Sequence, residues 1–117
     1  MKLIIAIIRP EKLEAVREAL KARLDEADNY RLTVCPVEGH GRQHGQPEFF
    51  RGLEMRTGFV RKLQIMIGVN DQYVHPAIEA IVSAARGEGA PGDGKIFVVP
   101  LEECVRIRTG ERGGRAI

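Results

Sequence analysis

The sequence predicts an α+β fold, a sandwich in which a four-stranded antiparallel sheet carries two helices on one face. Three observations lead to this fold class. The chain has 117 residues, which suits a single domain. Its periodic segments follow one another as strand, helix, strand, strand, helix, strand. Two β-α-β units with right-handed crossovers then give a ferredoxin-like βαββαβ arrangement over residues 1–117.

The first half of the chain contains a strand, an amphipathic helix and a second strand. Residues 2–9 form a nearly continuous apolar run, typical of a central strand. Pro10 suits the first position of a helix, and four apolar residues then recur at helical spacing: Leu13, Val16, Leu20 and Leu24. Residues 31–38 form the second strand. Pro36 cannot donate a hydrogen bond to a neighbouring strand, so this strand is predicted at an edge of the sheet.

The second half of the chain repeats this pattern. Residues 62–69 alternate as a strand, and residues 73–86 are amphipathic, with Pro76 in the first helical turn. We expect four side chains of this helix to point inward: Ile78, Ile81, Val82 and Ala85. Residues 96–100 form the last strand, and a basic segment over residues 106–117 follows.

One face of the predicted sheet has no cover. The first and third strands carry apolar residues on both faces, whereas the helices lie on one face only. A homo-oligomer is the simplest cover for such a surface.

Composition argues against several classes of function. The net charge of +2 is too small to indicate nucleic-acid binding, and 5% aromatic residues without Trp argue against a stacking platform. The apolar start is too short for a membrane span and no signal peptide is recognisable, so we expect a cytoplasmic protein. Cys35 and Cys104 lie far apart without a CxxC motif and are expected to be free and packed, with a disulfide or redox switch as the alternative.

Residues 39–58 form a long stretch without clean periodicity, and a loop of this length is usually functional. Side chains at its two ends suit a small carboxylate or a Mg²⁺ shell: Arg42, Gln43 and Lys62. His40 and His44 raise the alternative of a metal site, but no Cys or carboxylate partner stands near them in the sequence.

Residues 87–95 form a second glycine-rich loop that begins like a phosphate-binding P-loop. The classical motif is excluded, because Ile96 replaces the required Ser or Thr and a strand follows instead of a helix. Backbone N–H groups beside Lys95 still suit an anion nest, and a plain helix-to-strand turn is the alternative. Arg106 and Arg108 alternate, so we expect both guanidinium groups on one side of a strand, directed at phosphate or paired with nearby glutamates.

The chain resembles the PII signal-transduction proteins, the nitrogen-regulatory sensors of bacteria, archaea and plastids, along its whole length. The likeness rests on five segments: KLIIAIIRPEKLEAVREAL, VEGHGRQHG, EFFRGLE, GDGKIFVVPLEECVRIRTGER and the final AI. The resemblance implies a homotrimer, which would cover the bare sheet face, with ATP and ADP competing for clefts between subunits. It further implies a regulator, not an enzyme, that controls an ammonium channel, another transporter or a metabolic enzyme.

The resemblance also implies roles for individual residues. The positions that match nucleotide-binding residues are Thr33, Gly41, Gly92, Asp93, Gly94, Lys95, Arg106 and Arg108. Gln43 matches the ligand of Mg²⁺ that accompanies ATP, Lys62 matches the partner of 2-oxoglutarate, and Arg42 lies beside Gln43. The effector loop over residues 39–58 would present Phe49, Phe50, Arg51, Leu53 and Met55 to the regulated protein.

Several residues depart from the family pattern. Met55 and Leu53 replace the residues that relatives modify, so no modification site is expected. Gln64 and Met66 replace charged residues after Lys62. These departures leave an alternative function, a PII-like sensor of ADP, AMP or bicarbonate linked to carbon uptake, without a response to 2-oxoglutarate. A small enzyme would need a base beside the cleft, and no motif for one is evident.

Overall fold

The structure, a computed structural model, describes residues 1–25, 30–40, 48–50, 53–55, 58–89 and 91–117. Its main strands are β1 (Lys2–Ile8), β2 (Leu32–Gly39), β5 (Val60–Val69) and β6 (Gly94–Pro100). Its helices are α1 (Leu13–Arg23) and α2 (Asp71–Ala85), with short 3-10 turns at Pro10–Lys12 and Gly113–Ala116. Apart from a small hairpin described below, these elements account for the fold that the sequence predicts.

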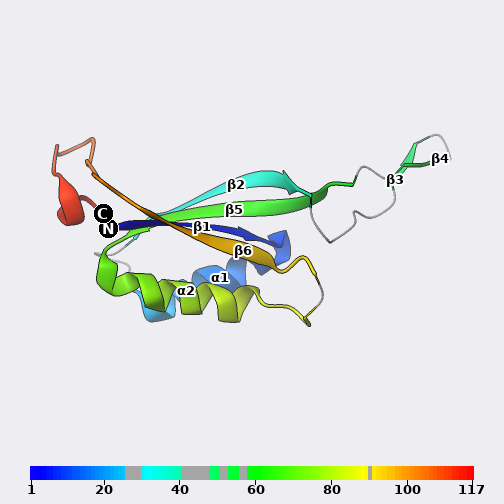
Figure 1. Ribbon diagram of the computed structural model, residues 1–117, viewed down its shortest axis with the longest axis horizontal. Helices are drawn as coiled ribbons and strands as arrows, with labels where there is room; N and C mark the ends of the chain where they lie inside the picture. Colours follow the sequence, from blue (N-terminus) through cyan, green and yellow to red (C-terminus); the bar gives the residue numbers. More distant parts are fainter. Residues whose placement is uncertain (26–29, 41–47, 51–52, 56–57, 90) are drawn as a thin grey trace.

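Four strands form an antiparallel sheet in the order β2-β5-β1-β6. Figure 1 shows α1 and α2 side by side on one face of this sheet, and the chain termini together at one end. The predicted fold class is therefore confirmed. The edge position predicted from Pro36 is also confirmed, because β2 pairs with β5 alone.

The hydrophobic core lies between the sheet and the two helices. Residues that pair across an antiparallel ladder share a face, and the pairs Ile4 with Ile67 and Ala6 with Ile65 are almost fully buried. The helices contribute their own buried residues: Val16, Leu20, Ala77, Ala80, Ile81 and Ala85. Each fully buried Ile or Leu contributes about 1.5–3 kcal/mol relative to an exposed side chain, so this one layer of contacts stabilises the domain.

The opposite face of the sheet is apolar and has no helix over it. By the same register, Leu3 and Ile5 of β1 share this open face with Phe97 and Val99 of β6. Phe97 is 49% exposed and Val99 is 41% exposed. The predicted bare face is thus present in the chain, and the apolar surface that these residues form lies on β1 and β6.

Two details of α2 differ from the sequence-based expectation. The helix begins at Asp71, so Pro76 lies in its second turn and not in its first. Val82 is 37% exposed and does not point inward, whereas Ile81 and Ala85 do. The reason is the small residues Ala77 and Ala80, which shift the buried stripe of the helix and leave Val82 at its margin.

A small antiparallel hairpin lies inside the long loop. Its strands are β3 (Glu48–Phe50) and β4 (Leu53–Met55), and Figure 1 shows it beyond the ends of β2 and β5. The sequence had indicated no regular structure here.

The two cysteines are free, as expected, but Cys35 is not packed. It lies on the edge strand β2, opposite Gln64, and its side chain is exposed on the open face of the sheet. Cys104 is half-buried. The expectation of packing fails for Cys35 because an edge strand has a neighbour on one side only.

Among the helices that the structure describes, none is long and apolar enough to cross a membrane.

Candidate functional site

The candidate site forms at the end of the sheet where β1 finishes and where β5 and β6 start. Ile8 pairs with Leu63 of β5 and with Gly94 of β6. Arg9 and Lys62, the next residues along their strands, therefore reach the same end of the sheet as the loop between α2 and β6. Sequence analysis had singled out Lys62 and the loop, but it had missed Arg9. The available signal was a basic residue directly after a central strand.

Gly94 allows this loop to enter β6 against β1. Its φ is +111°, and a Cβ atom there would lie 1.8 Å from the carbonyl oxygen of Ile7. A side chain is therefore excluded both by backbone conformation and by contact with another backbone. The glycine that the sequence placed in an anion-binding loop thus has a structural role as well.

Basic side chains from the sheet hold the loop at three successive residues. Arg9 donates a hydrogen bond from Nη2 to the carbonyl oxygen of Pro91 (3.1 Å), and its Nε lies 3.5 Å from Oδ1 of Asp93. Lys62 donates from Nζ to the carbonyl oxygen of Gly92. Asp93 also accepts a hydrogen bond through Oδ2 from the backbone N–H of Gly87, at 2.9 Å. The loop is therefore tied to both central strands.

The electrostatics of this cluster favour an anion. Lys62 is 8% exposed. Its burial lowers the pKa of its ammonium group, and the positive charge of Arg9 lowers it further, against the opposing effect of Glu11 and Asp93. A buried ammonium beside a guanidinium is stabilised by additional negative charge. A hollow of about 630 Å³ opens beside Lys62, lined also by residues of β2 and by Pro10.

Lys95 and Thr33 occupy the two opposite edges of the open face. Lys95 on β6 pairs with Ile7, and Thr33 on β2 pairs with Met66. Two strands, β5 and β1, separate these edges, so three inter-strand steps amount to about 14 Å. The two residues therefore do not adjoin one another within a single chain.

Arg106 and Arg108 lie at the other end of the sheet from the glycine-rich loop. β6 carries the chain from Gly94 to Pro100, and Pro100 pairs with Lys2 at the start of β1. Seven residues of strand span roughly 23 Å. Figure 1 shows the segment after β6 beside the chain termini, away from the loop between α2 and β6. A site that uses these arginines together with Lys95 therefore requires two copies of the chain.

The expectation that Arg106 and Arg108 lie on a strand is wrong. The backbone turns here: the N–H of Gly110 donates to the carbonyl oxygen of Arg106 (2.8 Å), and the N–H of Arg106 donates to that of Glu111 (2.9 Å). Gly110 has a φ of +75°, which permits the reversal. Arg106 also forms an ion pair with Glu111 at 3.4 Å, whereas Arg108 is exposed. The two guanidinium groups do not share one face of a strand.

Several predicted residues lie outside the described part of the chain: Gly41, Arg42, Gln43, His44 and Arg51. Phe49, Phe50, Leu53 and Met55 belong to β3 and β4, of which the backbone is described. Within the described ranges, no three His, Cys, Asp or Glu side chains are placed to hold a metal ion together. The ring of His40 instead packs near that of Phe59, with 5.7 Å between ring centroids.

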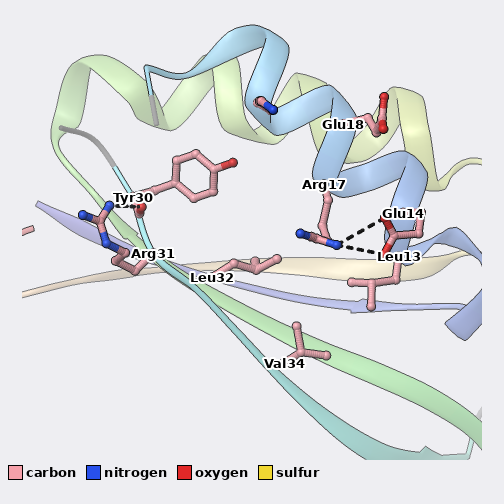
Figure 2. A pocket seen from close by; sticks show the side chains of 9 residues that line it. Leu13, Glu14, Arg17, Glu18, Tyr30, Arg31, Leu32 and Val34 are labelled. Atoms are coloured by element: carbon pink, nitrogen blue, oxygen red, sulfur yellow. Dashed lines mark hydrogen bonds and ion pairs between the residues drawn. The ribbon is translucent and has the colours of Figure 1, made fainter. Parts of the chain in front are cut away.

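A second hollow, of about 670 Å³, lies between α1 and the start of β2. Figure 2 shows its charged rim, where Arg17 contacts Glu14 at 2.9 Å, and its apolar wall at Leu32 and Val34. Acidic and basic groups alternate along α1 and partly neutralise one another. This hollow contains none of the predicted site residues, so the loop end of the sheet remains the candidate site.

Comparison with known proteins shows the family of this chain. The family described as "Nitrogen regulatory protein P-II" matches residues 1–111. The chain is 48% identical to nitrogen regulatory protein GlnK1 of Methanosarcina mazei, over all of this chain and 97% of that protein. It is 50% identical to nitrogen regulatory protein P-II of Azospirillum brasilense over the full length of both. The chain belongs to the P-II family of nitrogen regulatory proteins.

Proposed function

We propose that this protein is a P-II signal-transduction regulator that binds ATP or ADP between subunits and controls a transporter or a metabolic enzyme through residues 39–58. The observation that carries the proposal is the cationic end of the sheet, where Arg9 and Lys62 converge on a glycine-rich loop. Relatives that match the whole chain are named nitrogen regulatory proteins, which supports a regulatory role and not an enzymatic one. The protein acts in the cytoplasm in this proposal.

A homotrimer completes the proposed nucleotide site. Thr33 and Lys95 lie on opposite edges of the sheet, and Arg106 and Arg108 lie at its far end. Neighbouring copies that bury the open face would bring the edge of one sheet to the edge of the next. Lys95 of one subunit would then face Thr33 of its neighbour, with the arginines of the C-terminal segment (residues 106–117) completing the charge balance of the phosphates.

In this proposal 2-oxoglutarate binds with Mg-ATP beside Lys62. Gln43 and Arg42 would hold Mg²⁺ and the oxoacid, and the Lys62 ammonium would pair with a carboxylate. Since Lys62 also contacts the carbonyl oxygen of Gly92, an oxoacid that engages Lys62 affects the loop directly. This contact gives a physical route for coupling between the two ligands.

The test is calorimetric titration of ADP and Mg-ATP, followed by 2-oxoglutarate with and without Mg-ATP. We expect nucleotide binding, and 2-oxoglutarate binding in the presence of Mg-ATP alone. The variant Lys95→Gln should weaken nucleotide binding by about tenfold through loss of a charge-assisted phosphate contact. Lys21→Gln on the exposed face of α1 is the matched control and should bind as the wild type does. Absence of nucleotide binding to the wild type would overturn the proposal.

A second candidate is a sensor of ADP, AMP or bicarbonate without a 2-oxoglutarate response. The strand register of the sheet gives one observation in favour of this second candidate. Gln64 and Lys95 both pair with Ile7, and Met66 pairs with both Ile5 and Thr33. The two departures from the family pattern therefore lie in the rows of the open face that hold the predicted nucleotide residues. Nucleotide binding without any heat from 2-oxoglutarate, and with heat from bicarbonate or AMP, would favour this candidate.

A further inference from the structure

The loop between α2 and β6 is held from one side. Arg9 binds the carbonyl oxygen of Pro91, Lys62 binds that of Gly92, and Arg9 also contacts the carboxylate of Asp93. The oxygen atoms of three consecutive residues therefore face the cations at the end of the sheet.

The planarity of the peptide bond fixes the direction of the backbone N–H groups that follow these carbonyls. No peptide bond in the described chain is cis, and in a trans peptide the C=O and the following N–H point in opposite directions. The N–H of Gly92 is thus opposed to the carbonyl of Pro91, and the N–H of Asp93 to the carbonyl of Gly92. Both N–H groups face away from Arg9 and Lys62. The N–H of Asp93 closes the hydrogen-bonded turn at residues 91–92, whereas no acceptor among the described residues is recorded for the N–H of Gly92.

Asp93 is already engaged through both carboxylate oxygens. Oδ1 lies 3.5 Å from Nε of Arg9, and Oδ2 accepts the N–H of Gly87 at 2.9 Å. A Cβ atom at Gly87 would lie 2.8 Å from Oδ1, so the carboxylate packs directly on that backbone. Asp93 therefore bridges Gly87, the second residue after α2, to the end of β1 and closes the loop.

We infer that Arg9 and Asp93 form a positioning pair, which holds residues 91–93 so that the N–H group of Gly92 is presented to phosphate. The inference rests on the proposed nucleotide function and deepens it. It adds Arg9 to the residues that the site requires, and it gives the Asp93 side chain a role through Arg9 and Gly87 in place of contact with the nucleotide. A carboxylate in contact with phosphate would be repelled, whereas this one organises a donor for it.

The first test is the sign of the effect of Asp93→Asn on ADP binding, measured by calorimetry. If Asp93 acted on phosphate by charge alone, its neutralisation would tighten ADP binding. The positioning pair predicts the reverse, a weakening of about tenfold, because the ion pair with Arg9 is lost. Glu88→Gln is the matched control: it removes an exposed acid from the same loop, and it should leave ADP binding unchanged or slightly tighter. Tighter binding by Asp93→Asn would overturn the inference.

The second test separates geometry from charge at Arg9. Arg9→Lys keeps the positive charge, but one ammonium group does not reproduce the fork that reaches both Pro91 and Asp93. We expect Arg9→Lys to weaken ADP binding nearly as much as Arg9→Gln does. The double variant Arg9→Gln/Asp93→Asn should lose little more than either single variant, because both changes break the same contact. Full rescue by Arg9→Lys, or additive losses, would contradict the pairing.

A third measurement does not depend on nucleotide binding. Hydrogen exchange of the Gly87 amide in the unliganded protein reports the bond to Asp93 directly. Faster exchange in both Arg9→Gln and Asp93→Asn, with unchanged exchange in the strands, supports the pair. Unchanged exchange at Gly87 in both variants would overturn the pair even if ADP binds the wild type. A wild type that binds no ADP would overturn the proposed function and the phosphate role of the pair, while the exchange rates would still decide whether the contact orders the loop.

Discussion

At the scale of single residues, Gly94 connects the fold to the candidate site. Its backbone passes so near the Ile7 carbonyl that a side chain has no space, and its positive φ is costly for any other residue. The sequence marks Gly94 as one glycine among several in a loop. A glycine that only gives flexibility looks the same in the sequence as one that the fold requires. The difference at Gly94 comes from the neighbouring strand β1, which is far away in the sequence.

Gly94→Ala should therefore destabilise the protein by about 3 kcal/mol or more, because strain at positive φ adds to a clash with backbone. Gly110→Ala is the matched control: Gly110 has a φ of +75° but nothing lies within 4 Å of its ideal Cβ position. It should cost about 1–2 kcal/mol from backbone strain alone. Urea unfolding followed by circular dichroism measures both free energies of unfolding. Equal costs would contradict the close approach to Ile7.

Lys62 should make stability depend on pH in a direction that its environment fixes. Burial and the charge of Arg9 lower the pKa of Lys62 below the ordinary 10.5. Between the lowered pKa and 10.5, the unfolded chain binds a proton that the folded chain has lost, so stability rises with pH. Below the lowered pKa, the cost of charging the buried amine is fully present.

The comparison that isolates this effect is wild type against Lys62→Met, with free energies of unfolding measured from pH 7 to pH 11. The stability of the wild type relative to the variant should rise as pH increases through that window. Exposed Lys21→Met serves as the control. A difference for Lys62→Met that is flat or falls with pH would show that the amine is not desolvated as the structure indicates.

At the scale of elements, the strands and helices follow from periodicity, and the differences arise where tertiary contacts decide. β1, β2, β5 and β6 lie within two residues of their expected limits at every end. Burial alternates with the pleat along β1 and most of β5, the two central strands, but not along the edge strands β2 and β6. The sequence-based prediction placed the start of α2 at residue 73, two residues too late. The first turn of this helix is stabilised by the chain terminus and not by a local cap, so no local signal marks its start. The turn at Arg106 was read as a strand because alternation over three residues does not exclude a reversal at Gly110.

The start of α2 provides a prediction of its own. The Met1 ammonium lies 2.8 Å from Oδ1 of Asp71, and this hydrogen bond and charge lower the pKa of the Asp71 carboxyl. A group with a lowered carboxyl pKa contributes stability above its ordinary pKa of 3.8, and loses it as pH falls through the lowered value. Asp71→Asn should therefore lower the melting temperature at pH 6.

The same difference should shrink as pH falls through the lowered pKa of the Asp71 carboxyl, because the protonated carboxyl loses its charge interaction with the Met1 ammonium. Glu18→Gln, at an exposed position of α1, is the control in these thermal melts. A pH-independent loss for Asp71→Asn would instead indicate a helix-start effect without the amine.

At the scale of the whole molecule, residue types could be predicted from the sequence but their grouping could not. Lys62, Gly92 and Lys95 were singled out and do meet at one end of the sheet, whereas Arg106 lies at the other end. The resemblance grouped the arginines with the loop as nucleotide-binding positions, yet β6 carries the chain across the length of the sheet between them. The arrangement of such a site across copies depends on sheet topology and on a surface that one chain leaves uncovered.

The open face of the sheet leads to the last prediction. Phe97 is 49% exposed there beside Val99, in an apolar surface that spans β1 and β6. Burial of this surface between copies removes apolar area from water, and a charge placed in it opposes that burial. Phe97→Glu should therefore convert the proposed trimer to monomers in light-scattering chromatography, without unfolding a chain in which residue 97 is already half-exposed. Ala15→Glu on exposed α1 should leave the proposed trimer intact. If the proposed nucleotide site lies between copies, Phe97→Glu should also lose ADP binding, although it changes no predicted phosphate ligand. A monomeric Phe97→Glu variant with wild-type ADP affinity would show that the site is complete within one chain. A wild-type protein that is itself monomeric would contradict a nucleotide site shared between copies.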